Sequence, residues 1–522
     1  MKEEKNLKFL SEIHGEKCWP WVDKLSPCEK ACPIHTDIPS YIMAISQGKF
    51  KEALAVIRET NPFPSVCGRV CHHPCEMDCN RSLLDEPIAI RGLKRFVADY
   101  ELKAGQKPAP VKRTKKEKVA VIGSGPAGLT AAYDLIQQGY GVTVYEALPF
   151  AGGMLNAGIP KFILPREILA ADVNYIRALG VEIKFNIRIG DELSLADLSK
   201  EGFDAFLLAT GSPKSIPLNI PGSDLENVKL ALPLLQKVNW GEKVIFEGRV
   251  MVIGGGAVAV DIARSVKRLR ADEVHMACLE PRKEMPAFPW LIEAAEKEGV
   301  IIHSSLAPQR FEGISSEGKK RIIIEFKRVA SIHVGAEGQI SWTLGEGAGS
   351  EYIMEVDSLV IAIGQVPDPS FIGESRVQVS GRGSFIVDPD TLATSVPGVF
   401  AAGDAVGVRG TVVDAIATGH RVAQSIQRYL EGEVLKEKRM VAVKEVLKID
   451  PQMAPPWLTR KDRWEMPSLY PKDAVRTFSE VDIGYIQAQA IEEAKRCLNC
   501  RMCVNCLYSR NQLCFETGSR IL

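Results

Sequence analysis

The residues with the most distinctive chemistry in this chain are its thirteen cysteines, which gather near the two ends of the sequence. Seven lie between Cys18 and Cys79, five lie between Cys497 and Cys514, and only Cys278 lies between these groups. In a large chain of ordinary composition, clustered cysteines indicate metal binding rather than disulfides. The candidate ligands are Cys28, Cys32, Cys67, Cys71, Cys75, Cys79, Cys497, Cys500, Cys503, Cys506 and Cys514.

The spacing of these cysteines fits iron–sulfur clusters, and the dinucleotide fingerprint described below favours them over zinc. Four cysteines recur every four residues up to Cys79, and four recur every three residues from Cys497. Four thiolates at such intervals can converge on one cluster, and Cys32-Pro33 has the usual form of the end of a ferredoxin ligand run. Zinc, which also takes closely spaced thiolates, is the alternative. His72 and His73 lie inside the first run and are expected to be neighbours of the site rather than ligands.

A second group of residues could bind the phosphates of a dinucleotide. The β-branched run 119–122 leads into Gly123, Gly125 and Gly128, which have the spacing G-x-G-x-x-G and precede a helical Ala/Leu pattern. The first glycine permits the turn, the second lets the backbone approach a pyrophosphate, and the third lets helix and strand pack closely. Glu146 ends the next predicted strand, where an acceptor for a ribose hydroxyl is expected.

Other residues are predicted to surround the same cofactor. The glycine-rich loop 152–158 would let the backbone lie against a flat ring system, and an apolar run ending at Gly211 returns toward it. Asp404 could accept from a ribityl hydroxyl, and a helix beginning near Val412 could direct its positive N-terminus at a flavin. The predicted FAD-site residues are Gly123, Gly125, Pro126, Ala127, Gly128, Glu146, Gly153, Met154, Thr210, Gly211, Gly403, Asp404, Thr411 and Val412.

The pattern of strand, glycine turn and helix occurs a second time. The run 250–253 leads into a G-x-G-x-x-A sequence and a helix predicted over 261–269, so the chain should hold two nucleotides. The next predicted strand ends at Glu280, a carboxylate that would accept from a ribose 2′-OH and repel a 2′-phosphate; this favours NAD over NADP, although Arg282 and Lys283 argue in the opposite direction. The predicted NAD-site residues are Gly254, Gly256, Ala257, Val258, Glu280, Arg282 and Gly364.

The elements that must position these residues define the fold class. Helices are predicted from the Asp37 cap to Gly48, over 50–59 and over 88–102, followed by a basic linker at 103–118. A β-meander is expected over 310–360 and an arm packed along the body over 436–490. We predict an α/β protein with two Rossmann-like domains, the NAD domain inserted in the FAD domain. The expected limits are 1–110 (helical iron–sulfur domain), 111–247 and 362–435 (FAD domain), 248–361 (NAD domain) and 436–522 (arm with a cysteine-rich tail).

Composition excludes several classes of protein. Lys+Arg and Asp+Glu number 65 each, so no net charge attracts nucleic acid or an anionic membrane. No apolar run approaches the roughly 18 residues of a membrane span, and the first residues lack the apolar core of a secretion signal. We therefore expect a cytoplasmic protein with no nucleic-acid partner and no membrane insertion.

Together, these motifs resemble the glutamate synthase small-subunit family, which includes the flavin subunits of electron-bifurcating transhydrogenases and the N-terminal half of dihydropyrimidine dehydrogenase. The resemblance covers about residues 25–430 and implies FAD in the first fold, NAD(P) in the second and two 4Fe-4S clusters in the helical domain. The matching motifs are Cys32-Pro with Asp37-Ile-Pro, Asn61-Pro-Phe-Pro with Cys67-Gly-Arg-Val-Cys71, the first glycine fingerprint, Gly152-Gly with Gly158-Ile-Pro, Ala209-Thr-Gly211, Ile253-Gly-Gly-Gly256, Met285-Pro-Ala, Ala362-Ile-Gly-Gln365 and Ala402-Gly-Asp404.

The chain departs from the family pattern at both kinds of site. Leu279-Glu280 replaces the basic pair that holds the NADP phosphate, in agreement with NAD. The family's N-terminal Arg-Cys-Leu-x-Cys is missing from the start of the chain and appears instead at 496–500. We hypothesise that one cluster is held as the family pattern implies and that Cys28 shares a second with the C-terminus. The first ligand set would be Cys32, Cys71, Cys75 and Cys79, and the second would include Cys28, Cys497 and Cys500.

The simpler alternative is a self-contained C-terminal cluster on Cys497, Cys500, Cys503 and Cys506. Cys18 and Cys514 lie outside any regular spacing, so two or three clusters are expected in all.

These features predict an NADH-dependent electron-transfer flavoprotein subunit. Hydride transfer between nicotinamide and flavin needs stacking and orientation, so no catalytic acid, base or nucleophile is predicted. Clusters would carry electrons to or from one or more oxidoreductase or iron–sulfur subunits in a hetero-oligomeric complex. The alternatives are a stand-alone NAD(P)H-dependent reductase of a small molecule and a glutamate synthase small subunit itself. A disulfide reductase is disfavoured because only Cys278 lies in a nucleotide domain.

Overall fold

The computed structural model describes residues 25–436 and 459–500, except for 106–107, 192, 317–318, 336–339, 348, 374 and 408–409. Cys18, Cys503, Cys506 and Cys514 lie outside the described residues, so the hypothesis of a self-contained C-terminal cluster is not addressed. Within this part of the chain, no helix combines the length and apolar character that crossing a membrane requires.

The N-terminal domain is helical, as predicted. Asp37 caps its second helix by accepting from Ser40 N at 3.1 Å. The helix predicted over 88–102 begins and ends two residues later, and it stops at Gly105 in the left-handed region. The elements are α2 (Pro27–Ala31), α3 (Ile38–Ser46), α4 (Phe50–Arg58), α5 (Pro64–Val70), α6 (Pro74–Met77), the 3-10 helix η2 (Asn80–Leu83) and α7 (Ile90–Ala104).

The first dinucleotide fold is a five-stranded parallel sheet with the order β16-β4-β1-β2-β3. Its strands are β1 (Lys118–Ile122), β2 (Gly141–Tyr145), β3 (Glu182–Lys184), β4 (Ala205–Leu208) and β16 (Val399–Ala401). Its helices are α8 (Pro126–Gln137), α9 (Met154–Ala157), α10 (Arg166–Ala178), α11 (Leu195–Lys200) and α15 (Val412–Leu430), with short 3-10 helices η4 (Ser370–Ile372) and η5 (Gly403–Val406). Strands β1, β2 and β4 are buried along most of their length, which is the pattern of a parallel sheet covered on both faces.

The second fold is another parallel sheet, with the order β6-β14-β7-β8-β9. Its strands are β6 (Val228–Leu230), β7 (Arg249–Ile253), β8 (Glu273–Ala277), β9 (Val300–His303) and β14 (Ser358–Ile361). Its helices are α12 (Ala231–Asn239), α13 (Ala257–Arg268), α14 (Pro289–Lys297) and the 3-10 helix η3 (Arg282–Glu284). The insertion of one fold in the other is confirmed, because β4 and β16 of the first sheet flank the whole second sheet in the sequence.

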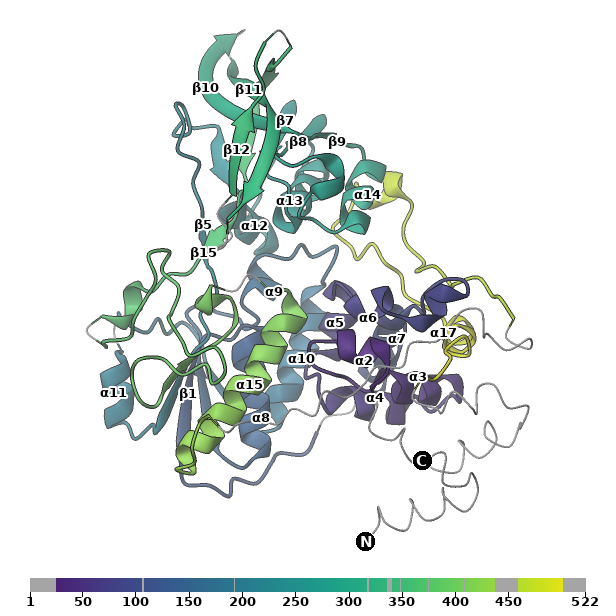
Figure 1. Cartoon of the computed structure of the whole chain (residues 1–522), viewed down its shortest axis with the longest axis vertical. Coiled ribbons are helices and arrows are strands. Elements are labelled where there is room, and N and C mark those ends of the chain that lie inside the picture. Colours follow the sequence, from purple (N-terminus) through teal and green to yellow (C-terminus); the bar gives the residue numbers. More distant parts are fainter. Residues whose placement is uncertain are drawn as a thin grey trace.

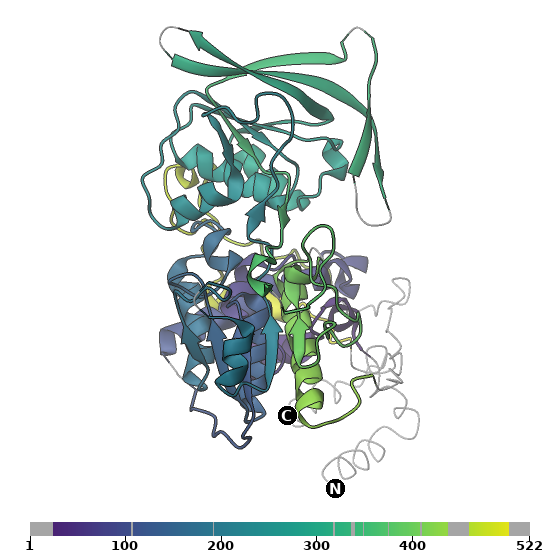
Figure 2. The same cartoon turned by 90° about the vertical axis from the view of Figure 1, so that its left-hand side faces the viewer.

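An antiparallel sheet stands above the second fold. It consists of β10 (Leu306–Ser316), β11 (Lys319–Val334), β12 (Ile340–Leu344) and β13 (Glu351–Val356). The long strand β11 pairs with the three others, so β13 returns to β11 instead of extending a simple meander from β12. Figures 1 and 2 show this sheet at the top of an upper lobe, with the first fold and the helical domain side by side below.

Two connections join the lobes, and they run next to each other as β5 (Lys214–Ser215) and β15 (Gln365–Val366). Since β6 already pairs with β14 in the second sheet, we propose that the first crossover lies between β5 and β6, earlier than the expected limit at 247. Two local expectations were wrong. Helix α13 begins at Ala257 directly after the glycine turn, not at Asp261, and β8 ends at Ala277, three residues before Glu280.

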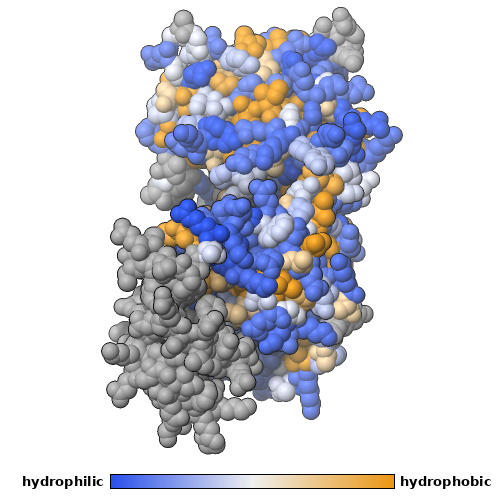
Figure 3. Space-filling view, turned by 90° about the vertical axis from the view of Figure 1, so that its right-hand side faces the viewer, coloured by the Kyte–Doolittle hydropathy of each residue, from blue (hydrophilic) through white to orange (hydrophobic). Residues whose placement is uncertain are grey.

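The C-terminal arm joins the upper lobe to the helical domain (Figure 1). Arg268 of α13 donates to Thr477 O at 3.1 Å, near α16 (Pro471–Ala474), and α17 (Gln487–Ala494) contacts α3 and α7. The arm also exposes Tyr470, Ile483 and Ile486. Figure 3 shows a mostly hydrophilic face on the right-hand side of the molecule, with hydrophobic residues in small separate groups.

Candidate functional site

The first glycine fingerprint forms the predicted turn between β1 and α8. Gly123 has φ +104°, and a Cβ there would lie 2.5 Å from Ala209 O, so neither the backbone conformation nor the neighbouring strand accepts a side chain. At Gly125, by contrast, a Cβ would meet nothing within 4 Å. The middle glycine therefore opens onto free space at the N-terminus of α8, where a phosphate could approach the backbone N–H groups.

That free space belongs to a cavity of about 560 Å³. Of the predicted FAD-site residues only Gly128 does not line it, because Gly128 packs against β1 behind the turn. The other predicted residues all line the cavity: Gly123, Gly125, Pro126, Ala127, Glu146, Gly153, Met154, Thr210, Gly211, Gly403, Asp404, Thr411 and Val412. Its lining residues follow the ends of β1, β2, β4 and β16, where an extended dinucleotide binds in such folds.

Polar groups in this cavity fit a flavin dinucleotide. Glu146 is buried and accepts from Ser124 N at 3.0 Å and Leu148 N at 2.9 Å, which fixes its carboxylate beside the glycine turn. Thr210 Oγ1 is buried without a partner among the described residues. Burial raises the pKa of Asp404 to about 6. A ribityl chain or ribose would supply hydroxyl partners to such groups.

The second fingerprint repeats this geometry between β7 and α13. Gly254 has φ +142°, and a Cβ there would collide with Ala362 O, just as a Cβ at Gly123 would meet Ala209 O. A Cβ at Gly256 would meet nothing within 4 Å, so Gly256 and the following Ala257 can face a ligand at the start of α13. Gly364, which ends the connection after β14, has φ +130°. This similarity supports a second nucleotide site.

The two charged NAD-site candidates differ in their surroundings. Glu280 Oε2 would lie 2.8 Å from a Cβ on Gly255, so the carboxylate faces the glycine turn, and burial raises the pKa of Glu280. Arg282 instead forms a bidentate pair with Glu296 of α14, at 2.7 and 2.9 Å. The acid is thus close to the turn, whereas the nearby guanidinium already has a partner.

Val258 and Asp261, at the start of α13, line the first cavity, so the two nucleotide sites open toward each other. Asp261 Oδ1 is buried with no hydrogen-bond partner among the described residues, and burial raises the pKa of Asp261 to about 7. Sequence reasoning assigned Asp261 to the beginning of a helix and missed this position. Its place four residues after Ala257, one turn further along the same helix, was the available signal.

Eight of the nine cysteines among the described residues divide into two groups of four, and Cys278 belongs to neither. Cys28, Cys79, Cys497 and Cys500, here called the outer set, line one narrow pocket and are each partly exposed. Ser26 Oγ lies 3.1 Å from Cys28 Sγ, and Asn80 Nδ2 donates to Cys500 Sγ at 3.4 Å. Such donors stabilise thiolates. The convergence of thiols from both ends of the chain fits a four-thiolate cluster.

The remaining four, Cys32, Cys67, Cys71 and Cys75, form an inner set whose members are all buried. His73 N donates to Cys71 Sγ at 3.4 Å. Among the described residues, no three His, Cys, Asp or Glu side chains come close enough together to hold a single metal ion. A 4Fe-4S cluster binds its four thiolates around a larger centre, so four thiols too far apart for a single ion can still hold a cluster.

This partition differs from the hypothesis that Cys79 joins Cys32, Cys71 and Cys75. A spacing of four keeps two residues on one face only while the helix continues, and α6 ends at Met77. Cys79 follows that end and adjoins the outer pocket, and Cys67 on α5 takes its place in the inner set.

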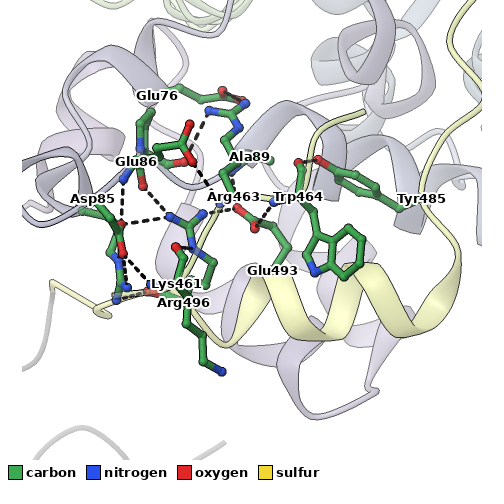
Figure 4. A network of polar contacts seen from close by, with 12 residues as sticks. Glu76, Asp85, Glu86, Ala89, Lys461, Arg463, Trp464, Tyr485, Glu493 and Arg496 are labelled. Carbon is green, nitrogen blue, oxygen red and sulfur yellow. Dashed lines mark hydrogen bonds and ion pairs between the residues drawn. The ribbon is translucent and has the colours of Figure 1, made fainter. Parts of the chain in front are cut away.

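A buried polar network fixes the C-terminal cysteines to the helical domain (Figure 4). Arg496, immediately before Cys497, donates to Glu493 Oε1 at 2.8 Å, Asp85 Oδ1 at 2.9 Å, Glu86 O at 2.7 Å and Lys461 O at 3.1 Å. Glu493 in turn accepts from Ala89 N at 2.9 Å. These bonds hold α17 against the segment between η2 and α7. Cys497, which follows α17, is thereby placed in the outer set.

Two side chains relate the cysteine sets to the flavin cavity. His72 follows Cys71. Burial lowers the pKa of His72, and the nearby carboxylate of Asp414, in the first turn of α15, offsets part of this effect. Fully buried Tyr41 lies near both sets, since the thiols of Cys75 and Cys28 add to the effect of burial in raising its pKa. His72 thus relates the inner set to α15, and Tyr41 is a shared neighbour of the two cysteine sets.

His72 and His73 also contact the upper lobe. His72 stacks on Phe288 with ring centroids 5.2 Å apart, and His73 lies 4.4 Å from the Trp290 ring. Phe288 and Trp290 stack on each other at 4.8 Å. These four rings join the loop that carries Cys71 and Cys75 to the N-terminus of α14.

Comparison with known proteins supports this arrangement of domains. Residues 117–419 match the family model described as pyridine nucleotide-disulphide oxidoreductase, and residues 15–106 match the model described as dihydropyrimidine dehydrogenase domain II, 4Fe-4S cluster. The M. tuberculosis FprA structure in complex with NADPH superposes with a TM-score of 0.51 at 16% identity, covering 61% of this chain and 85% of FprA. That likeness concerns the fold alone.

Curated relatives are similar over most of the chain. The beta subunit of NADP(+)-dependent formate dehydrogenase from Moorella thermoacetica is 40% identical over 505 residues, covering 91% of this chain and 70% of that protein. The PreT subunit of NAD-dependent dihydropyrimidine dehydrogenase from Salmonella typhimurium is 34% identical, covering 78% and 91%. The glutamate synthase [NADPH] small chain from Escherichia coli is 33% identical, covering 77% and 88%. The first match necessarily includes part of the C-terminal arm.

Proposed function

The chain belongs to the pyridine nucleotide-disulphide oxidoreductase family, and from this premise we propose that it is the NADH-oxidising or NAD⁺-reducing subunit of a larger electron-transfer complex. The predicted resemblance to glutamate synthase small subunits is confirmed, and the relatives are NAD(P)H-dependent oxidoreductase subunits. FAD, NAD(P) and a 4Fe-4S cluster follow from the two family models. The preference for NADH, the two cluster sites and the kind of partner are our proposals.

When bound, FAD and NAD(P)H exchange a hydride and the clusters carry single electrons. The protein binds and orients these groups. Gly125 and Gly153 would bring backbone close to the flavin dinucleotide, and the N-terminus of α15 would direct its dipole at the ring. Because the start of α13 lines the same cavity, a nicotinamide held by the second turn would be directed toward the flavin. Asp261 would hold a proton at its carboxylate near neutral pH.

We propose that the nucleotide is NADH. The carboxylate of Glu280 faces the second glycine turn, where it would accept from the 2′-OH of an adenosine ribose and repel a 2′-phosphate. Arg282, the nearest candidate for a phosphate, is paired with Glu296. The formate dehydrogenase relative is named for NADP(+) and the PreT relative for NAD. The preference of this chain between the two nucleotides must therefore be inferred from its own residues.

We propose one 4Fe-4S cluster in each cysteine set. The observation that carries the relay is that His72, next to Cys71, approaches Asp414 of α15, while Tyr41 lies near both the buried inner set and the partly exposed outer set. Electrons would then pass between flavin and a partner through the inner site and then the outer site, or in the reverse order. Since the formate dehydrogenase beta relative shares part of the arm, the partner is proposed to be a further oxidoreductase subunit docking near the C-terminal cysteines.

Anaerobic purification followed by iron and flavin analysis tests this proposal. Cys75→Ser and Cys67→Ser should each remove about four iron atoms, and Cys79→Ser and Cys497→Ser should each remove another four. Cys278→Ser, far from both sets, should change neither iron nor FAD content. If Cys79→Ser and Cys75→Ser remove the same iron, the partition is wrong. A preparation that binds FAD but contains no iron in the wild-type chain would contradict the relay itself.

A further inference from the structure

The inner cysteine set includes a buried cation. Lys94 lies on α7 with only 5% of its surface exposed. Buried lysines normally pair with a carboxylate, because an isolated ammonium is costly to bury. No hydrogen bond or ion pair joins Nζ of Lys94 to any described residue, whereas its neighbour Arg95 pairs with Asp99 at 3.3 Å and Glu480 at 2.9 Å. The charge of Lys94 therefore lacks a carboxylate partner in the described part of the chain.

Helix packing places this charge beside the inner thiols. Helices α5 and α7 meet at Gly68, where a Cβ would lie 2.6 Å from Arg95 Cα. This contact brings Lys94 next to Cys67 and Cys71, which flank Gly68 on α5 and at its end. The negative charges that these two cysteines carry as cluster ligands, and those of Cys32 and Cys75, all act on the Lys94 ammonium. Lys94 is thus in electrostatic contact with the whole inner set.

Other charges near the inner set are balanced. Glu76, next to Cys75, pairs with Arg463 at 2.6 Å. Arg91, which also acts on Cys71, is partly exposed, so its field is screened by solvent. Lys94, by contrast, is buried near all four thiols and has no carboxylate partner among the described residues.

The outer set has no comparable excess charge among the described residues. Arg81 pairs with Asp85 at 2.5 Å, and Arg496 pairs with Glu493 at 2.8 Å and Asp85 at 2.9 Å. The sulfurs there receive neutral donors, from Ser26 and Asn80. The two sets therefore offer different electrostatic surroundings to the same kind of cluster.

We propose that Lys94 is a positioning residue. Its positive charge raises the reduction potential of the inner cluster above that of the outer cluster. This inference depends on the proposed cluster sites. A cluster with four thiolate ligands is an anion that becomes more negative by one charge when it accepts an electron, so a buried ammonium stabilises the reduced form more than the oxidised form. Of the two electrons that one NADH gives up, the first to reach the clusters would stay at the inner site and the second would be available to the outer site.

The test is a potentiometric titration of the full chain, followed by electron paramagnetic resonance. The signal of the inner cluster is identified as the one that Cys75→Ser removes. In Lys94→Met, the ratio of reduced to oxidised inner cluster at a fixed potential should fall at least tenfold, which corresponds to about 59 mV for one electron. The outer signal, which Cys497→Ser removes, should titrate as before.

Two controls separate charge from packing. Lys103→Met makes the same change at an exposed position of α7 and should leave both titrations unchanged. Lys94→Arg keeps the positive charge and should remain within about threefold of the wild-type ratio. Iron and FAD contents show whether each variant is assembled, and Lys94→Gln replaces Lys94→Met if the latter loses iron.

An unchanged inner titration in a fully loaded Lys94→Met or Lys94→Gln chain would overturn the inference. Loss of the inner cluster in both neutral variants would also overturn it, in favour of a purely structural role. If Cys75→Ser removes no signal from the wild-type spectrum, the proposed inner cluster is itself wrong. That result differs from an inner cluster whose potential does not depend on Lys94.

Discussion

We propose that single side chains decide which nucleotide and which clusters this protein can hold. Glu280 and Arg496 have opposite charges, but each is fixed next to a proposed cofactor site. Glu280 faces a glycine turn, and Arg496 precedes the first C-terminal cysteine. Both roles depend on geometry that a conservative substitution would disturb without unfolding a domain.

Glu280→Gln should weaken discrimination against NADPH. The amide keeps the size of the side chain but loses the charge that repels a 2′-phosphate, so the ratio of kcat/KM for NADH to that for NADPH should fall about tenfold, or about 1.4 kcal/mol. Steady-state reduction of an artificial acceptor measures this ratio. Glu273→Gln, at the opposite end of β8, is the control and should not change it. A ratio unaffected by Glu280→Gln would exclude the carboxylate as the source of specificity.

Arg496→Lys should cost the protein its outer cluster. Lysine keeps the charge but cannot form the four bonds to Glu493, Asp85, Glu86 and Lys461, because it lacks the planar fork of the guanidinium. We expect loss of about four iron atoms with FAD retained. Arg460→Lys, on the exposed part of the arm, is the matched control. Full iron content in Arg496→Lys would show that the network does not position Cys497.

At the scale of elements, α15 connects the flavin cavity to the helical domain. His420 on this helix lies 2.6 Å from Asp134 Oδ2 of α8 and 2.8 Å from Thr60 O, which follows α4. Burial lowers the pKa of His420, but the pair with Asp134 outweighs this and raises it. The protonated imidazole therefore ties three elements together, and the strength of this tie depends on pH.

His420→Gln should destabilise the protein more at pH 6 than at pH 9. Because the pKa of His420 is raised in the folded state, its contribution is complete below the pKa of the unfolded chain and is lost as pH rises through the folded pKa. A cost of about 1–2 kcal/mol at the lower pH is expected. Thermal unfolding at both pH values measures it, with the exposed His333→Gln as control. An equal or larger cost at pH 9 would show that the imidazole acts when neutral.

Local elements were predictable where a few neighbouring residues determine them. The glycine turns after β1 and β7, the Asp37 cap and the start of α15 each follow from a short motif, because strand, turn and cap chemistry act within a few residues. The start of α13 was predicted four residues too late, at Asp261, although the glycine turn already begins the helix at Ala257. The pairing of β6 with β14 joins residues more than a hundred positions apart, and no local signal encodes it.

The partition of the cysteines was beyond sequence reasoning for the same cause. Regular spacing suggested that Cys79 belongs with Cys75, but the end of α6 at Met77 separates them. That Cys28 meets Cys497 and Cys500 was expected from the displaced Arg-Cys-Leu-x-Cys motif, and the structure brings these three together with Cys79. Motifs thus indicated which cysteines are candidate ligands, whereas only tertiary packing divides the described ones between two sets.

For the whole molecule, the main question is how the upper lobe stays in register with the domains below. Two strands, β5 and β15, and the C-terminal arm cross between the lobes (Figure 1). Beside these covalent links, the stack of His72, His73, Phe288 and Trp290 joins the inner cysteine loop to α14. Burial lowers the pKa of His73 to about 4, so its ring is neutral at physiological pH and stacks without a charge to solvate.

Phe288→Ala should loosen this contact and slow the encounter of nicotinamide with flavin. Each aromatic pair contributes about 0.5–1.5 kcal/mol beyond its buried area, and Phe288 takes part in two of the three pairs. We expect faster amide hydrogen exchange at 72–76 and 288–292, together with a several-fold slower reduction of FAD by NADH in stopped flow. Trp342→Ala, which removes an exposed aromatic ring from β12 of the same lobe, should alter neither measurement. If exchange accelerates while flavin reduction keeps its rate, the stack holds the lobes together but does not align the two nucleotide sites. The β5–β15 crossing would then suffice for that alignment.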